Sequence, residues 1–279
     1  MSSDPDKQAL ADLFSATSAT HDSAGGLFAH FGALLVERAA LGPGDRVLDV
    51  AAGTGASLIP AARRVGPKGH VIGLDIAPGM VARLRERIEL LDIGNAEALV
   101  GDAESLTFDD ADFDAVLCGF GLFFFADTAR ALAEIKRVLR VGGSFAVSTF
   151  TRKGSDSMDA TWERIGGYMP VPVAAEREGR FDERSSLASA LAAAGFGDVE
   201  VTESPFDVVL PDIDTWITWL RAMEFGEYLA RMTQETLDDF RRSAFEEFSR
   251  RSDGPEVRFP MDAYLTVARK PASYPLGSS

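Results

Sequence analysis

The stretch RVLDVAAGTGAS, residues 46–57, joins a short apolar run to a turn of small residues and carries one acid, Asp49, inside the run. The apolar run predicts a buried strand. The glycines of the turn permit backbone angles that other residues avoid, and they remove side chains that would block a ligand. The stretch therefore predicts a strand followed by a tight turn, with something binding very close to its backbone.

Strand-like and helix-like patterns alternate on both sides of this stretch. The predicted strands cover residues 46–51, 70–76, 97–103, 113–120, 144–150, 197–203 and 258–270. The predicted helices cover residues 27–40, 56–65, 78–92, 127–140 and 184–194. Pro60 lacks a backbone donor, so we expect the helix around it to start late or to kink. Apolar strands alternating with amphipathic helices are typical of a parallel sheet covered on both faces, and the sequence predicts a doubly wound α/β fold.

Composition narrows the range of partners and locations. The formal net charge is −15, whereas binding to phosphate backbones requires clustered Lys and Arg, so no nucleic acid is expected. Cys118 is the single cysteine, which excludes an internal disulfide. No apolar run approaches the ~20 residues of a membrane span, and the first residues lack the pattern of a signal peptide. We expect a cytoplasmic protein without membrane or metal sites.

Three predicted strands end in an acid or in a turn of small residues, at the edge where doubly wound sheets bind ligands. Asp75 follows Gly55 by 20 residues, and Asp102 ends the next strand. A glycine turn with such an acid also occurs in nicotinamide-dependent oxidoreductases, which remain an alternative. However, the third glycine of their motif is absent after Gly53, and Asp49 disfavours a pyrophosphate while suiting an ammonium group. The pattern favours a ligand with an adenosine, an amino-acid-like cationic end and no phosphate.

Four segments carry a family resemblance: VLDVAAGTG, GLDIAPGM, GDAESLTFDDADFDAV and EIKRVLRVGGSFAV. Together they resemble the class I S-adenosylmethionine-dependent methyltransferases, especially the ubiquinone/menaquinone-biosynthesis branch and small-molecule enzymes of antibiotic pathways. The resemblance covers roughly residues 45–150. It implies a Rossmann-like fold with a mostly parallel, seven-stranded sheet, S-adenosylmethionine as cofactor and S-adenosylhomocysteine as product.

The resemblance also implies a role for each matching position. The implied cofactor residues lie at the ends of four strands: Asp49, Ala51, Gly53, Gly55, Asp75, Ile76, Met80, Asp102, Ala103, Cys118 and Gly119. By resemblance, Asp49 lies near the ammonium, Asp75 binds the ribose hydroxyls and Asp102 accepts from the adenine amine. Ala51 replaces the first glycine of the family's usual G-x-G-x-G motif. The N-P-P-Y-type signature of nucleic-acid amino-methyltransferases is missing.

Structural readings compete with these roles. Gly53 and Gly55 could merely close a tight turn, and Asp75 could cap the helix that Pro78 opens. Cys118 fits a small apolar filler.

The candidate catalytic bases are His21 and His30, in a segment that the resemblance places over the active site as a lid. A positioned base speeds methyl transfer to an alcohol by ~10²–10⁴-fold, whereas a phenolate, amine or enolate needs less help. His21 could equally cover the cofactor without taking a proton.

The predicted domain organisation places the acceptor beside the cofactor core. It comprises an N-terminal helical lid (1–42), a cofactor-binding core (43–150), substrate-side insertions (151–182 and 205–256), the remaining core (183–204 and 257–270) and a disordered tail (271–279). Within the insertions, 152–182 shows no clear period, while 211–249 is helical and rich in bulky apolar residues. These residues predict a hydrophobic small-molecule acceptor, although dimerisation through them is an alternative.

The predicted function is methyl transfer to that acceptor, with oxygen favoured over carbon or nitrogen. A protein of the same fold that acts as a cyclase or scaffold without methyl transfer is the rival.

Overall fold

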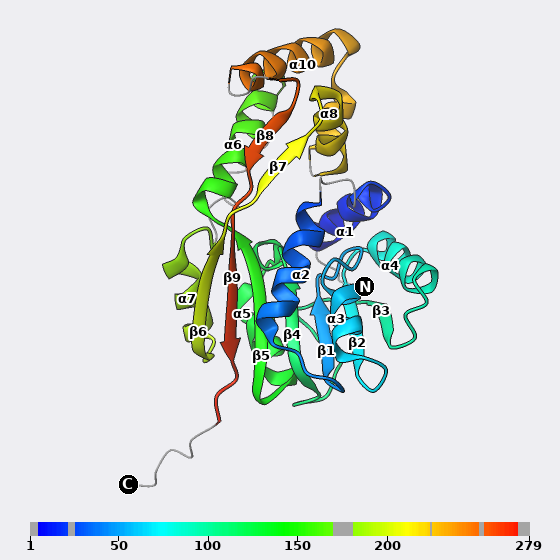
Figure 1. The fold of residues 1–279 in the computed structure, drawn as a ribbon, viewed down its shortest axis with the longest axis vertical. Coiled ribbons are helices and arrows are strands. Elements are labelled where there is room, and N and C mark those ends of the chain that lie inside the picture. Colours follow the sequence, from blue (N-terminus) through cyan, green and yellow to red (C-terminus); the bar gives the residue numbers. More distant parts are fainter. Residues whose placement is uncertain (1–4, 22–25, 170–180, 224, 251–253, 273–279) are drawn as a thin grey trace.

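The computed structural model describes residues 5–21, 26–169, 181–223, 225–250 and 254–272, and its centre is a seven-stranded sheet in the order β3-β2-β1-β4-β5-β9-β6 (Figure 1). The strands are β1 (Arg46–Val50), β2 (His70–Asp75), β3 (Ala96–Val100), β4 (Phe113–Gly119), β5 (Leu139–Phe150), β6 (Gly197–Ser204) and β9 (Ala263–Arg269). All pairings among β1 to β5 are parallel, whereas β9 runs antiparallel to both β5 and β6. The predicted fold, a doubly wound and mostly parallel sheet of seven strands, is confirmed.

Helices cover both faces of this sheet. One face carries α2 (Leu27–Ala39), α3 (Leu58–Val65) and α4 (Pro78–Leu90), and the other carries α5 (Thr128–Val138) and α7 (Arg184–Ala193). Strand β4 shows why the central strands are continuous apolar runs. Its residues Ala115 and Leu117 pack in the first apolar cluster, while Val116 and Cys118 pack in the second. Both faces are buried, so nearly every position of the strand must be apolar.

Pro60 delays α3, as predicted. The helix begins at Leu58, and Pro60 is its third residue. At that position a backbone N–H has no partner inside the helix, so the missing donor costs little.

The sequence prediction is wrong between β5 and β9. Residues 152–166 form a regular helix, α6 (Arg152–Gly166), where no clear period was recognised. Residues 170–180 of that predicted irregular segment lie outside the described residues. The segment 211–249 is helical, as predicted, and consists of α8 (Ile213–Ala222), α9 (Gly226–Arg231) and α10 (Gln234–Ser249).

The predicted last strand, 258–270, is also two strands. β8 (Val257–Pro260) pairs antiparallel with β7 (Asp207–Leu210) in a separate ribbon, and β9 returns to the main sheet. The break falls at Asp262, whose carboxylate accepts hydrogen bonds from the Phe206 amide at 3.1 Å and from Lys153 at 2.9 Å. These bonds hold the chain where it leaves one sheet for the other.

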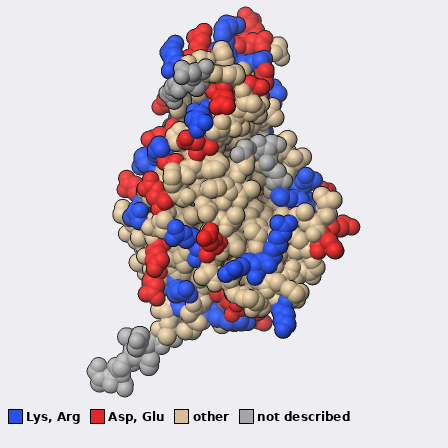
Figure 2. All heavy atoms as spheres, viewed as in Figure 1, with Lys and Arg blue, Asp and Glu red and all other residues tan. Residues whose placement is uncertain are grey.

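The ribbon and helices α6, α8 and α10 stand together beyond the end of the sheet at which β5 leads into α6 (Figure 1). Trp216, Trp219 and Phe225 are buried within this part, at most 2 % exposed. They pack in the chain's own core, which leaves them unavailable for the dimer contact considered above. On the face shown in Figure 2, basic and acidic side chains are interspersed around a broad uncharged area.

At the N-terminal end, α1 (Pro5–Thr17) lies against α4. A Cβ built on Gly79 would stand 2.7 Å from the Ser15 backbone, and the Ser15 hydroxyl accepts from the Gly79 amide at 3.1 Å. The helix therefore crosses α4 at a glycine that lets the two backbones approach. Residues 273–279 of the predicted disordered tail lie outside the described residues. Among the residues that are described, no helix has the length and apolar character needed to cross a membrane.

Candidate active site

A cavity of about 760 Å³ opens at the carboxyl ends of β1, β2 and β4. Its volume falls in the usual range for small-molecule sites, ~300–1,000 Å³. It gathers most of the predicted site residues: His21, Asp49, Ala51, Gly53, Asp75, Ile76, Met80, Asp102, Ala103 and Gly119. Gly55, Cys118 and His30 are not part of its lining.

The turn after β1 has an unusual backbone. Ala51, Gly53 and Gly55 have φ angles of 53°, 52° and 95°. A Cβ on Gly55 would stand 2.5 Å from Leu84 of α4, so this glycine serves the packing of the turn against that helix. Ala51 is the costly position, because residues with a Cβ avoid positive φ.

Gly121 explains how an alanine fits at position 51. A Cβ built on Gly121 would stand 2.5 Å from the Ala51 methyl group. The methyl group of Ala51 thus has room only because residue 121, 70 positions further along the chain (121 − 51), is a glycine. Gly121 was not among the predicted residues, and its separation from Ala51 hides the pairing in the sequence.

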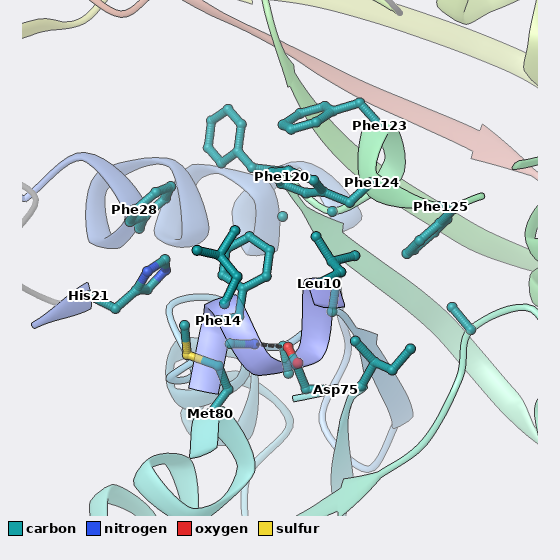
Figure 3. A pocket seen from close by; sticks show the side chains of 18 of the residues that line it. Leu10, Phe14, His21, Phe28, Asp75, Met80, Phe120, Phe123, Phe124 and Phe125 are labelled. Atoms are coloured by element: carbon teal, nitrogen blue, oxygen red, sulfur yellow. Dashed lines mark hydrogen bonds between the residues drawn. The ribbon is translucent and has the colours of Figure 1, made fainter. Parts of the chain in front are cut away.

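Asp75, at the end of β2, holds the turn in place. One carboxylate oxygen accepts from the Gly53 amide at 2.8 Å (Figure 3), and the other accepts from the Ala77 amide at 2.9 Å. Burial raises the pKa of Asp75, although the two amides favour its charged form. An ionised carboxylate offers about four acceptor directions, so Asp75 can still accept from hydroxyl groups in the cavity.

Asp49 lies at the bottom of the cavity and is 1 % exposed. Neither carboxylate oxygen has a hydrogen-bond partner among the described residues. Burial, and next the nearby Asp75, raise the pKa of Asp49 well above its usual value. The Leu58 amide at the start of α3 lies close enough to act in the opposite direction, but its geometry does not make a hydrogen bond. A buried acceptor without a donor is costly, and a cationic ligand in the cavity would supply one.

Asp102 has partners that the sequence did not reveal. Its carboxylate accepts from Lys7 of α1 at 2.7 Å and from the Glu104 amide at 2.9 Å. Lys7 also pairs with the buried Glu104 carboxylate at 2.6 Å. These contacts attach α1 to the loop that follows β3.

Aromatic rings from three segments of the chain line the cavity (Figure 3). Phe14 comes from α1, Phe28 from α2, and Phe120 from the loop after β4. His21 stacks on Phe28 with ring centroids 4.7 Å apart. Its Nε2 lies 3.9 Å from the position of a Cβ built on Gly53, so the imidazole faces the glycine turn.

Two predicted residues lie elsewhere. His30 is exposed and stacks on Phe206 with ring centroids 4.7 Å apart. Cys118 is fully buried in the core of the sheet, and burial raises the pKa of its thiol to about 12. Such a thiol stays protonated and unreactive.

The far end of the cavity is built by elements that follow the core. Helix α6 contributes one set of residues and the region of α9 another: Ser155, Met158, Asp159, Trp162, Met223, Glu227 and Tyr228. None of them was predicted individually. The bulky apolar side chains of both segments were the signal available in the sequence.

Comparison with known proteins agrees with this geometry. Residues 47–143 match the family described as a methyltransferase domain. Aklanonic acid methyltransferase DauC of Streptomyces sp. strain C5 is 36% identical over 144 residues, 51% of this chain and 66% of that protein. The ubiquinone/menaquinone biosynthesis C-methyltransferase UbiE of Ectopseudomonas mendocina is 34% identical over 171 residues, 58% of this chain and 66% of that protein. The chain thus spans slightly less than two thirds of each of these curated relatives.

Similarity in three dimensions extends further along the chain. The crystal structure of the YcgJ protein from Bacillus subtilis covers 88% of this chain and 100% of its own, with a TM-score of 0.59 and 20% identity. At this identity the likeness concerns the fold alone. The matched domain and the two relatives show that residues 47–143 form a methyltransferase domain, consistent with the class I S-adenosylmethionine-dependent methyltransferases.

Proposed function

We propose that this protein transfers the methyl group of S-adenosylmethionine to a hydrophobic, quinone-like or polyketide small molecule, with oxygen as the acceptor atom. The observation that carries the proposal is the buried carboxylate of Asp49, which has no donor among the described residues and faces a cavity beside a glycine turn. An ammonium group satisfies it, and a pyrophosphate in its place would be repelled. The residues present therefore fit a cofactor with a cationic amino-acid end.

Each part of the cofactor has residues suited to hold it. Ala51 and Gly53 bring the backbone close to the methionine portion. Asp75 accepts from the ribose hydroxyls with its unused lone pairs. Ile76 and Met80, which line the cavity next to Asp75, pack on the adenine.

The bound cofactor supplies a methyl group on a positively charged sulfur. The chain contributes alignment of the acceptor with that methyl group and exclusion of water, which supply much of the rate in such displacements. Phe14, Phe28 and Phe120 close the cavity and present aromatic faces that stabilise a cation. We assign His21 as the candidate base for a hydroxyl acceptor, since it lies in the cavity, and no longer propose His30, which is exposed and outside the lining.

The acceptor side consists of the lid helices α1 and α2 and of the predicted insertions 151–182 and 205–256, as far as they are described. The names of the two relatives point to quinone and polyketide acceptors, and one of them is a C-methyltransferase. Oxygen is proposed here because the cavity holds polar groups suited to a hydroxyl beside apolar walls, and a hydroxyl profits most from a base.

Two measurements test the proposal. S-Adenosylhomocysteine at ~100 times its dissociation constant should add ~2.7 kcal/mol to the free energy of unfolding, whereas NADH should add nothing. Incubation with S-adenosylmethionine and either a demethylmenaquinol, the reduced hydroxyl form of the quinone, or a hydroxyanthraquinone should then yield a methylated product by mass spectrometry, with the new methyl on oxygen. Cofactor binding with an acceptor that changes without gaining a methyl group would favour the cyclase; binding of NADH alone would favour the oxidoreductase.

A further inference from the structure

One face of α6 lines the far end of the cavity. Ser155, Met158, Asp159 and Trp162 are separated by three, one and three residues, the spacing of side chains on a single helical face. The helix follows β5 after one residue, Thr151, which caps it through a hydrogen bond from the Gly154 amide to the Thr151 hydroxyl at 3.2 Å. This face therefore has a fixed place relative to the sheet.

The walls around this face are flat and apolar. Trp162 meets Tyr228 edge to face with ring centroids 5.1 Å apart. Three phenylalanines also line the cavity: the ring of Phe150 stacks on that of Phe120, with centroids 4.4 Å apart, and its centroid lies 6.1 Å from that of Phe123. Such walls fit a planar ring system, because stacked and edge-on contacts both favour flat aromatic partners.

Asp159 is an acid at this end of the cavity for which no partner is found among the described residues. Its carboxylate is half-buried and makes no hydrogen bond or ion pair with any described residue. Glu227, the other acid at this end, is paired with Arg231. Elsewhere in the cavity, Glu104 is paired with Lys7 and Asp75 with backbone amides. Asp49 is assigned to the ammonium group of the cofactor, and Arg152, whose charge attracts Asp159, forms its ion pairs with Asp182 and Glu183. The carboxylate of Asp159 is therefore available to an acceptor.

We propose that Asp159 is a specificity-determining residue that accepts a hydrogen bond from a hydroxyl group of a planar aromatic acceptor lying between α6 and the phenylalanines of the β4 and β5 ends. The inference rests on the proposed function for the identity of the cavity. The hydrogen bond selects hydroxylated ring systems over their methyl ethers, because an ether presents only acceptors to a carboxylate. A site built to bind a hydroxyl discriminates strongly against analogues that lack it.

The test compares two ligands that differ in a single methyl group. Binding of 2-hydroxyanthraquinone and 2-methoxyanthraquinone to the full chain is measured by calorimetry, at a pH at which the hydroxyl is protonated. A hydrogen bond to a charged group predicts that the wild-type protein binds the hydroxyl compound at least about 10-fold more tightly. Equal affinities, or no binding of either compound, overturn the proposal without any variant being needed.

Two variants test whether Asp159 causes the preference for the hydroxyl compound. In Asp159→Asn the preference should fall to within about 2-fold of unity, because the amide is a weaker acceptor than the carboxylate. Asp156→Asn is the matched control: Asp156 lies on the same helix, is exposed and is not part of the cavity lining, so the preference should persist. A preference that survives in Asp159→Asn refutes the assignment.

Two further measurements distinguish the role of Asp159 from the proposed function and from a site that binds cations. S-Adenosylhomocysteine should bind the wild-type protein and both variants alike, and its failure to bind the wild-type protein would refute the proposed function while leaving the comparison of the two anthraquinones valid. Benzyltrimethylammonium tests for a cationic ligand in the same aromatic site. If it binds tightly and the two anthraquinones do not differ, the site recognises cations and the proposal is wrong.

Discussion

Replacing Asp49 by asparagine keeps the shape of the side chain and removes a charge that has no partner among the described residues. An unpaired polar group at a buried position costs about 1–3 kcal/mol in mutational series, and a charge costs more than an amide. We therefore expect Asp49→Asn to raise the free energy of unfolding of the ligand-free protein by about 1–3 kcal/mol. For a chain of 279 residues with an unfolding entropy of ~2.1 cal/mol/K per residue, this gain corresponds to an increase in Tm of about 2–5 °C.

The gain in the free energy of unfolding that Asp49→Asn brings should depend on pH. The pKa of Asp49 is raised in the folded protein above its usual value of 3.8. At a pH above both values the ionised carboxylate weakens the folded state, and below the unfolded value Asp49 is protonated in both states and costs nothing. The stability advantage of Asp49→Asn should thus be full at high pH and disappear as the pH falls towards 3.8.

The same substitution should impair cofactor binding, since the ammonium loses its charged partner. S-Adenosylhomocysteine at ~100 times its wild-type dissociation constant should stabilise the wild-type protein by ~2.7 kcal/mol. A loss of about 1.5–3 kcal/mol in affinity leaves Asp49→Asn a gain below about 1.4 kcal/mol at that concentration. Thermal unfolding with and without the ligand measures both effects on one sample.

Asp182→Asn serves as the control, because Asp182 is also buried but is not part of the cavity lining. Its gain from S-adenosylhomocysteine should equal that of the wild-type protein. If Asp49→Asn were less stable without ligand and kept its full ligand gain, the role assigned to Asp49 would be refuted.

Three other substitutions probe the rest of the site. Asp75→Ala should weaken S-adenosylhomocysteine binding by about 1.5–3 kcal/mol in calorimetry, because the ribose bonds are lost and the Gly53 amide is released; an unchanged affinity would contradict the assigned role. Lys7→Met should lower the free energy of unfolding by about 2 kcal/mol in urea titrations, since the buried Glu104 carboxylate loses its ion pair, and an unaltered midpoint would mean that the ion pair contributes nothing. The proposal that His21 is the base predicts a loss of about 10²-fold or more in kcat for His21→Ala with nearly intact cofactor affinity, whereas equal losses in both would make it a covering residue.

The sheet could be predicted from the sequence because its strands are buried on both faces. Residues such as Val116 and Leu117 point to opposite clusters and are both apolar, so the run is visible without knowing its neighbours. The acids at the strand ends were visible for a similar reason, since Asp75 ends the apolar strand β2 and Asp102 follows β3 by two residues. Local pattern and local structure agree there.

The sequence could not reveal features that depend on distant partners or on a ligand. Helix α6 was missed because Ser155 and Asp159 face a cavity rather than a core, and these polar residues break the apolar period of the helix. The pairing of Lys7 with Asp102 joins residues 95 apart in the chain. The fit of Ala51 against Gly121 likewise exists only after β1 and β4 have paired.

The junction between β5 and α6 determines which side chains of α6 face the cavity. Thr151 is fastened there on two sides, by its amide to the Asp262 carbonyl at 2.9 Å and by its hydroxyl to the helix. One inserted residue after it would rotate α6 by ~100° and swing Trp162 and its neighbours out of the cavity, with the cofactor end untouched. Single side chains on α6 can therefore change without moving the helix, whereas a change in the length of this connection would remove its whole inner face from the cavity.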